Sequence, residues 1–237
     1  MTLNAGFHTL WPTPLGLHRY PAAAALNPLL VRMFGALRAT QSAVRGEAPG
    51  AFFASDDDLL QRVQLPEWQG LVRYFVECLR DTVTQANRGA WPASTERTGL
   101  SLQVAIEGLW FQCANRNAFH DVHTHGNCSW SGVYCVQVDP PERRCTHPTH
   151  GELNGTTRFY GPPFARLGGA HVDLGNAYLQ PAHVDVAPLP GQLVLFPSWL
   201  AHQALPYEGE LDRMVISFNA SIHQAHGTDR LHGYRAA

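Results

Sequence analysis

The chain has 237 residues, of which 45% are hydrophobic and 15% charged, and its formal net charge is −2. It is long enough to bury a core, and its near-neutral charge excludes the strongly basic surface of a nucleic-acid-binding protein. No apolar stretch reaches the roughly 18 residues that span a bilayer, and the N-terminus lacks a signal-peptide pattern. The five cysteines include no C-x-x-C pair, which is typical of a reduced cytoplasmic protein.

The first third of the sequence predicts an extended segment followed by helices. Residues 9–20 are rich in proline and aromatic residues, which favours an extended conformation. Asn27 and Pro28 form a cap and first-turn pair, so we expect a helix to begin there. The acidic run 56–58 precedes a short helical pattern, and a longer one extends from Pro66 to Ala86. These helices predict a support for the rest of the fold.

Beyond Gly89 the pattern changes to strands. Alternating or continuous apolar runs predict strands at Leu100–Cys113, Ala118–Val138, Arg158–Tyr160, Gln192–Pro197 and Arg213–Ser221. Residues 139–157 are expected to form a polar loop, residues 170–190 an irregular segment, and the tail after His223 a loose end. Helices followed by many short strands indicate a mainly β sandwich or barrel.

Three histidines in the strand region predict a metal site. His123 and His125 are two residues apart in AFHDVHTHGN, so on an extended segment both imidazoles leave the same face. His202 follows an apolar strand and a Pro-Ser-Trp turn, and it can supply a third ligand. Such a three-ligand site with open coordination positions is typical of non-haem iron.

Arg213 makes the prediction more specific. In RMVISFNAS, Met214 and two further apolar residues share one face of a strand, whereas Arg213, Val215 and Ser217 share the other. A guanidinium and a hydroxyl on a concave face can bind a carboxylate.

At this point the sequence resembles a family. HTHGNCSWSGVYCV, PGQLVLFPSWLAHQALP and RMVISFN are similar to the H-x-H-x-N, S-G-V-Y-Y, L-x-F-P-S-W-L-x-H and R-x-S-x-S-F-N pattern of 2-oxoglutarate- and Fe(II)-dependent oxygenases. The early LWPTPL resembles the N-terminal signature of the same family, so the likeness extends over nearly the whole chain.

The resemblance implies a fold, a reaction and a set of site residues. The fold is a double-stranded β-helix (jelly roll) buttressed by helices, in a single domain 1–237 with an N-terminal extended and helical part at 1–90 and the core at 98–222. The reaction consumes O2 and 2-oxoglutarate, releases succinate and CO2, and hydroxylates a C–H bond of an amino acid, peptide or small metabolite. His123, His125 and His202 would surround Fe(II), and Arg213, Ser217 and Tyr134 would bind 2-oxoglutarate.

Other ligands and contacts remain open. This superfamily usually uses two histidines and one carboxylate, but no carboxylate follows either histidine at the required spacing. Asn127 occupies that position if His125 is the first ligand, and Asp121 shares the face of His123 by spacing. We favour the three histidines because neutral imidazole binds a first-row metal better than an amide does. Trp130 and Trp199 are candidate substrate contacts.

Two departures from the family pattern concern the cofactor. Val215 stands where the family has a serine, and Cys135 stands where it has a second tyrosine.

Separately, Cys145, His147 and His150 have a spacing that suits zinc, although an ordinary surface insertion is the simpler interpretation.

Two other functions stay possible. One is a cupin-type three-histidine dioxygenase that does not use 2-oxoglutarate, and the other is a non-enzymatic ligand-binding jelly roll. We expect a small-molecule or peptide partner, no nucleic acid and no membrane, and a homodimer is compatible with the sequence.

Overall fold

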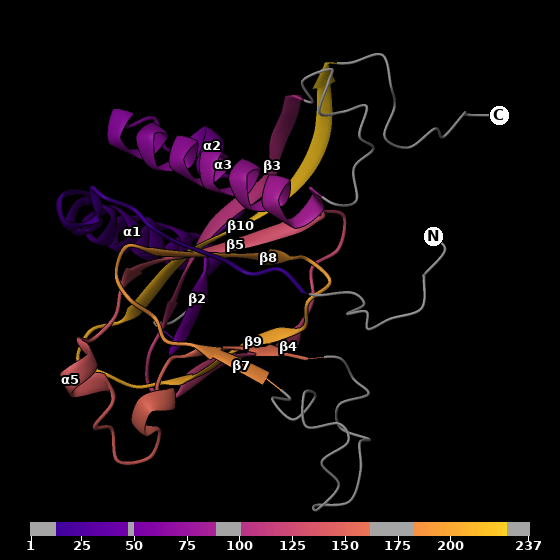
Figure 1. Cartoon of the computed structure of the whole chain (residues 1–237). Coiled ribbons are helices and arrows are strands. Elements are labelled where there is room, and N and C mark those ends of the chain that lie inside the picture. Colours follow the sequence, from indigo (N-terminus) through magenta and orange to yellow (C-terminus); the bar gives the residue numbers. More distant parts are fainter. Residues whose placement is uncertain (1–12, 47–49, 89–100, 162–182, 227–237) are drawn as a thin grey trace, which may run out of the picture.

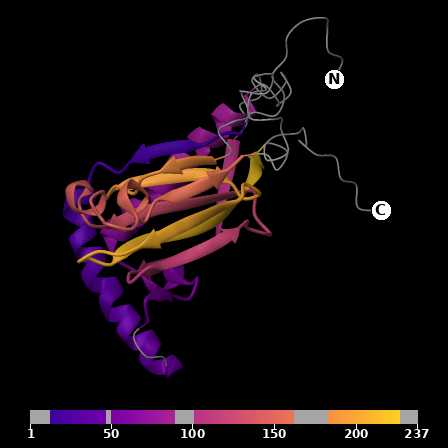
Figure 2. The same cartoon turned by 90° about the horizontal axis from the view of Figure 1, so that it is seen from below.

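Two antiparallel sheets face each other in the computed structural model, which describes residues 13–46, 50–88, 101–161 and 183–226. The six-stranded major sheet has the order β1-β8-β5-β10-β3-β2, and the four-stranded minor sheet has the order β4-β9-β6-β7. Figure 1 shows the minor sheet as a separate layer below the major one, and Figure 2 shows the same layers from below. The strands are β1 Gly16–Arg19, β2 Phe52–Ala54, β3 Ser101–Ala114, β4 Ala118–His123, β5 Trp130–Gln137, β6 Thr157–Tyr160, β7 His183–Val186, β8 Gln192–Pro197, β9 His202–Tyr207 and β10 Arg213–His226.

The chain passes repeatedly between the two sheets. From β3 to β10 it visits the major and minor sheets in turn, except that β6 and β7 are neighbours in the minor sheet. This alternation gives a double-stranded β-helix, in which the inner faces of both sheets enclose a common interior. The mainly β architecture with N-terminal helices, predicted from the sequence, is therefore confirmed.

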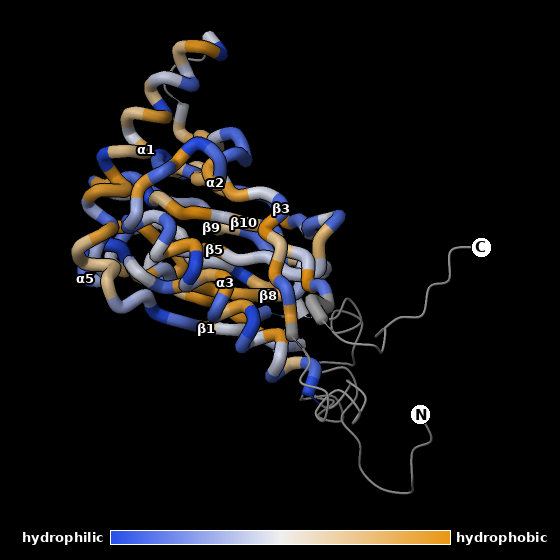
Figure 3. The backbone as a smooth tube through the Cα atoms, turned by 90° about the horizontal axis from the view of Figure 1, so that it is seen from above, coloured by the Kyte–Doolittle hydropathy of each residue, from blue (hydrophilic) through white to orange (hydrophobic). Residues whose placement is uncertain are grey.

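Helices cover the outer face of the major sheet. They are α1 (Ala23–Arg45), the single-turn α2 (Leu59–Arg62) and α3 (Pro66–Asn87), and α1 and α3 lie across that face in Figure 1. Both long helices are amphipathic, and Figure 3 shows apolar and polar residues interleaved along α1. Their buried residues join those of β3, β5, β8 and β10 in the largest hydrophobic core of the described residues.

Helix α1 begins earlier than the sequence predicts. It starts at Ala23, so Pro28 lies inside it and Asn27 is not its cap. A run of alanines precedes Pro28, and their strong helix propensity extends the helix in spite of the missing proline N–H. Asn27 is instead buried, where its amide donates to Val136 O at 2.8 Å and its carbonyl accepts from Tyr134 Oη at 2.8 Å. It therefore links α1 to β5.

Other boundaries agree with the sequence or correct it. The helix predicted at Pro66 to Ala86 and the strand predicted at Gln192–Pro197 are confirmed. The prediction of an irregular segment at 170–190 is wrong for β7, while residues 170–182 lie outside the described ranges. Strand β9 was missed because Pro206 suggested a turn, and β10 continues five residues past Ser221. The polar loop contains α5 (Pro141–Arg144) and the 3-10 turn η1 (Gly151–Leu153).

Gly132 leaves room on β5 for the side chains of the two neighbouring strands. A Cβ at Gly132 on β5 would collide with the Phe218 ring and would lie 3.0 Å from Leu195 Cδ2.

Within the described part of the chain, no helix is long and apolar enough to cross a membrane.

Candidate metal and cofactor site

The first two candidate ligands lie opposite each other in the minor sheet. His123 is the last residue of β4 and His202 the first of β9, and the two are cross-strand partners with ring centroids 4.3 Å apart. His202 is buried, 4% exposed, because it faces the interior between the sheets. A pair of imidazoles is thereby fixed by backbone hydrogen bonding at the end of two strands.

A β-bulge decides which residues of β4 face the interior. His123 lies three positions after His120, but their partners Ala204 and His202 on β9 are only two positions apart. The extra residue shifts the alternation, so His120 and His123 both face inward while Asp121 and Val122 are exposed. The prediction that Asp121 shares a face with His123 is therefore wrong.

His125 reaches the same point from the loop after β4. Its backbone N–H donates to Ser198 O at 2.9 Å, which ties this loop to the turn before β9. Its Nε2 lies 3.4 Å from Nε2 of His202. One potential ligand atom from each of His123, His125 and His202 lies within 4.8 Å of the other two. Two ligands bound about 2.1 Å from one ion are separated by about 3 to 3.4 Å, so the Nε2 atoms of His125 and His202 already have the spacing of two ligands of one cation.

Backbone carbonyls select the tautomers of two of the imidazoles. Nδ1 of His123 lies 2.6 Å from Asp121 O, and Nδ1 of His202 lies 2.9 Å from Leu200 O. A carbonyl oxygen only accepts hydrogen bonds, so Nδ1 carries the proton in both rings. Nε2 of each ring then holds a lone pair, which is the form that binds a metal.

Burial keeps His125 and His202 uncharged. Desolvation lowers the pKa of His202 to about 3 and, with smaller repulsion from neighbouring histidines, that of His125 to about 4. Both imidazoles are consequently uncharged at neutral pH and can coordinate a cation without first losing a proton.

A cavity joins the three histidines to Arg213. Its lining comes from both sheets: Trp110, Gln112, His120, His123, His125, Gly132, Val133, Thr157, His202, Ala204, Arg213, Val215, Ser217 and Phe218. The prediction that Arg213, Val215 and Ser217 share the concave face of β10 is confirmed, and Met214 and Ile216 belong to the helix-side core.

Arg213 is held with one edge of its guanidinium available. It is 5% exposed, its Nε donates to Gly155 O at 3.0 Å, and its Nη2 donates to Thr157 Oγ1 at 3.4 Å. These two bonds use the side edge, and within the described residues no acceptor binds the edge formed by Nη1. Desolvation lowers the pKa of Arg213. A buried cation in this setting favours an anionic ligand such as a carboxylate.

Several predicted site residues lie away from the cavity. Tyr134 and Trp130 belong to the helix-side core on the other face of β5, so the predictions of a cofactor contact and a substrate contact there are not supported. Trp199 is 62% exposed in the turn before His202. Asn127 is exposed in the loop after His125 and does not line the cavity.

The possible zinc ligands in the polar loop are engaged elsewhere. His150 Nε2 lies 2.5 Å from Asn117 Oδ1, and His147 Nε2 lies 3.4 Å from Glu208 Oε2. Among the described residues, the only group of three or more histidine, cysteine or acidic side chains placed to hold a metal is that of His123, His125 and His202.

Three polar cavity residues were not predicted. Gln112, His120 and Thr157 come from β3, β4 and β6. His120 stacks near His123 with ring centroids 4.0 Å apart, and burial lowers its pKa. Simple alternation along β4 does not predict that His120 faces inward, because the bulge shifts the alternation. Gln112 lies in the predicted strand Leu100–Cys113, and its polar side chain within that apolar strand could have indicated a place on the cavity face.

The donor set fits the group that the sequence resemblance implies. Three imidazoles converge on one point, and a buried guanidinium lines the same cavity. A divalent metal would bind the three imidazoles, and a carboxylate of an anionic ligand would bind the guanidinium.

Comparison with known proteins agrees with this site. A family model described as "Putative 2OG-Fe(II) oxygenase" matches residues 108–219, which include all three histidines and Arg213. A search of curated proteins gave no match.

Solved structures show the same fold. AviO1 from Streptomyces viridochromogenes Tue57 aligns with a TM-score of 0.52 and 14% identity over 88% of this chain and 90% of its own. A prolyl hydroxylase from Trichoplax adhaerens, in complex with a hypoxia inducible factor peptide, aligns with a TM-score of 0.50 and 12% identity over 88% of this chain and 84% of its own. At these identities the likeness concerns the double-stranded β-helix alone.

The family match and the three-histidine group together define the class of protein. The protein is an oxygenase, and its cofactors are Fe(II) and 2-oxoglutarate with O2 as cosubstrate. Residues 108–219 match the model of the 2OG-Fe(II) oxygenase family, so this part of the chain carries an oxygenase domain.

Proposed function

We propose that His123, His125 and His202 hold Fe(II) and that Arg213 and Ser217 bind the distal carboxylate of 2-oxoglutarate. The enzyme then hydroxylates a C–H bond of an amino acid, a peptide or a small metabolite and releases succinate and CO2. The observation that carries this proposal is the convergence of three imidazoles and one buried arginine on a single cavity.

The assignment of ligands rests on position and protonation. His123 and His202 each direct the Nδ1 proton to a backbone carbonyl, which fixes the ring and leaves Nε2 for the metal. Asp121 and Asn127, the alternative ligands, are exposed and do not line the cavity. An all-histidine set contributes no negative charge, so a bound Fe(II) keeps its full charge toward anionic ligands.

The chain's own residues also prepare the cavity for the cosubstrate. Arg213 offers one guanidinium edge, and Ser217 projects from the same face of β10. Buried apolar groups around His202, including Phe159 and Phe196, limit access of water to the ligands. Bound Fe(II) and 2-oxoglutarate supply the oxidising chemistry, while the protein positions them and excludes water.

One observation favours a second candidate. A site with three histidines and no carboxylate also suits a cupin-type dioxygenase that uses O2 without 2-oxoglutarate. Arg213 separates the two candidates, because that reaction needs no carboxylate-binding arginine at the far end of the cavity.

The test is a visible spectrum recorded without oxygen. Fe(II) is added to the metal-free protein, followed by 2-oxoglutarate, in the wild type and in Arg213→Ala. We expect a charge-transfer band only after the 2-oxo acid, and about 30-fold or more cosubstrate to reach it in Arg213→Ala, because a charge-assisted contact is lost. Tight Fe(II) binding without a band would favour the cupin-type reaction.

Single histidine variants test the ligand set in parallel. His123→Ala, His125→Ala and His202→Ala should each abolish tight Fe(II) binding measured by calorimetry. His223→Ala is the matched control, because His223 is an exposed histidine on β10. Equal loss in Asp121→Asn or Asn127→Ser would contradict the proposed ligand set.

A further inference from the structure

One position of β10 lacks a group that the family pattern provides. The pattern R-x-S has a serine two residues after the arginine, but this chain has Val215 there, on the cavity face beside Arg213 and Ser217. Valine has no hydrogen-bond donor, so this site loses one contact to a carboxylate bound by Arg213.

The residue paired with Val215 carries a donor. In the antiparallel pair of β10 and β3, Val215 is opposite Gln112, and Arg213 is opposite Ala114. Side chains directly opposite each other in such a pair lie about 4.5–5.5 Å apart at Cβ, and diagonal neighbours stay within reach of a long side chain. Ala114 has a short side chain, and Gln112 is the next inward residue along β3.

The Gln112 amide has no partner within the described protein. Gln112 is half-buried and lines the cavity, but no described residue forms a hydrogen bond with its side chain. Its neighbours on both adjacent strands, Val215 on β10 and Ala54 on β2, have apolar side chains. Its amide is therefore free to donate to a ligand in the cavity.

We infer that Gln112 donates to the distal carboxylate of 2-oxoglutarate and replaces the serine that the family has at position 215. This inference rests on the proposed function, since it requires the carboxylate to lie at Arg213. Gln112 is thus a cosubstrate-binding residue on β3. The hydrogen-bond donor that the family pattern has on β10, at position 215, lies on the adjacent strand β3 in this chain.

The experiment measures binding rather than turnover. Isothermal titration calorimetry gives the Kd of 2-oxoglutarate for the Ni(II)-loaded protein, which does not turn over. We expect Gln112→Ala and Gln112→Met to raise this Kd about tenfold, because a hydrogen bond to a charged group is lost. Ni(II) affinity in the absence of 2-oxoglutarate should not change.

Restoring the serine provides the decisive comparison. Adding Val215→Ser to Gln112→Ala should recover most of the lost affinity, whereas Val215→Ser alone should change the Kd less than Gln112→Ala does. Gln103→Ala is the matched control, because Gln103 is an exposed glutamine on the same strand, and its Kd should equal that of the wild type. Thermal unfolding of each variant identifies any loss of folded protein.

The outcomes separate this inference from the proposed function. A Kd within twofold of wild type in Gln112→Ala and Gln112→Met, or no recovery with Val215→Ser, would overturn the role of Gln112 alone if Arg213→Ala still weakens binding. Failure of 2-oxoglutarate to bind the Ni(II)-loaded wild type, or binding unaffected by Arg213→Ala, would overturn both.

Discussion

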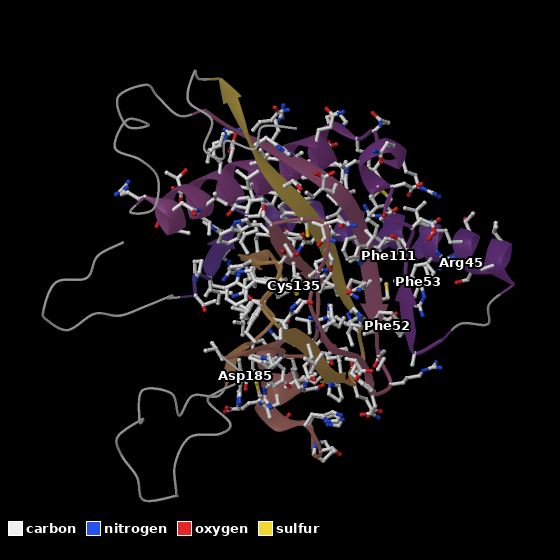
Figure 4. All side chains as sticks on the ribbon, turned by 90° about the vertical axis from the view of Figure 1, so that its right-hand side faces the viewer. Arg45, Phe52, Phe53, Phe111, Cys135 and Asp185 are labelled. Atoms are coloured by element: carbon white, nitrogen blue, oxygen red, sulfur yellow. The ribbon has the colours of Figure 1, made fainter. Side chains whose placement is uncertain are left out.

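The two faces of strand β10 differ in what they contribute. One face, with Met214 and Ile216, packs against the helices and joins the largest core. The other face, with Arg213, Val215 and Ser217, lines the cavity that the three histidines share. Figure 4 shows the same division on β2, where Phe53 lies toward the helix-covered side and Phe52 toward the minor sheet. The helix-side face contributes to the stability of the fold, while the cavity face carries polar groups that the fold does not need for stability.

The largest effect is expected on the helix-covered face. Phe111 is 0% exposed and stacks on Phe34 of α1 with ring centroids 4.3 Å apart. Phe111→Ala should lower the free energy of unfolding by about 3–5 kcal/mol, because it leaves a cavity between sheet and helix. Urea denaturation measures the loss. Phe119→Ala, at a phenylalanine that is 53% exposed on β4, should cost under about 0.5 kcal/mol.

A smaller loss is expected from the polar link between α1 and β5. Asn27→Ala removes the partner of Val136 O and of the buried Tyr134 hydroxyl. We expect a loss of about 1–3 kcal/mol, since buried polar groups are left unsatisfied. Tyr134→Phe removes only one of these contacts and should lose less in the same denaturation experiment. Loss of Fe(II) affinity in folded Tyr134→Phe would contradict the placement of Tyr134 away from the site.

The cavity face should respond in the opposite direction. Arg213 is a buried cation without a carboxylate partner among the described residues, so Arg213→Met should raise the stability of the ligand-free protein, by about 1 kcal/mol. Arg73→Met, at an exposed arginine of α3, should leave it unchanged. A clear destabilisation by Arg213→Met would show that Arg213 is primarily structural.

The smallest effect concerns an ion pair on the outside of the minor sheet. Arg158 binds Asp185 through two contacts of 2.8 Å and lowers the pKa of that carboxyl below its ordinary 3.8. The pair should stabilise the fold by about 0.2–1 kcal/mol near neutral pH. Because the pKa is lowered in the folded state, this contribution is present above about pH 4 and lost as the pH falls through the lowered pKa.

Asp185→Asn tests this pair by thermal unfolding at several pH values. Its difference from wild type should be present at pH 7 and shrink toward pH 3. Glu107→Gln, at an exposed carboxylate of β3, is the control for general charge effects. A difference that grows as the pH falls would contradict the assigned sign.

Local sequence patterns were sufficient to identify several residues of the site. The spacing of His123 and His125, the apolar strand before His202 and the alternation along β10 identified the residues that the structure gathers around one cavity. The prediction for β10 succeeded because side-chain direction in a regular strand depends only on the parity of the position. His125 converges for another reason, since it lies in the loop after β4, where its N–H is bound to Ser198 O.

Tertiary structure decided the features that depend on pairing between strands. The bulge in β4 brings His120 inward and turns Asp121 outward, and it is defined only by the register with β9. Helix packing placed Tyr134 beside Asn27 and away from the cavity, and the pairing of Gln112 with Val215 joins two residues that are 103 positions apart in the sequence. A local pattern cannot show such contacts, because the partner of each residue is set by the fold as a whole.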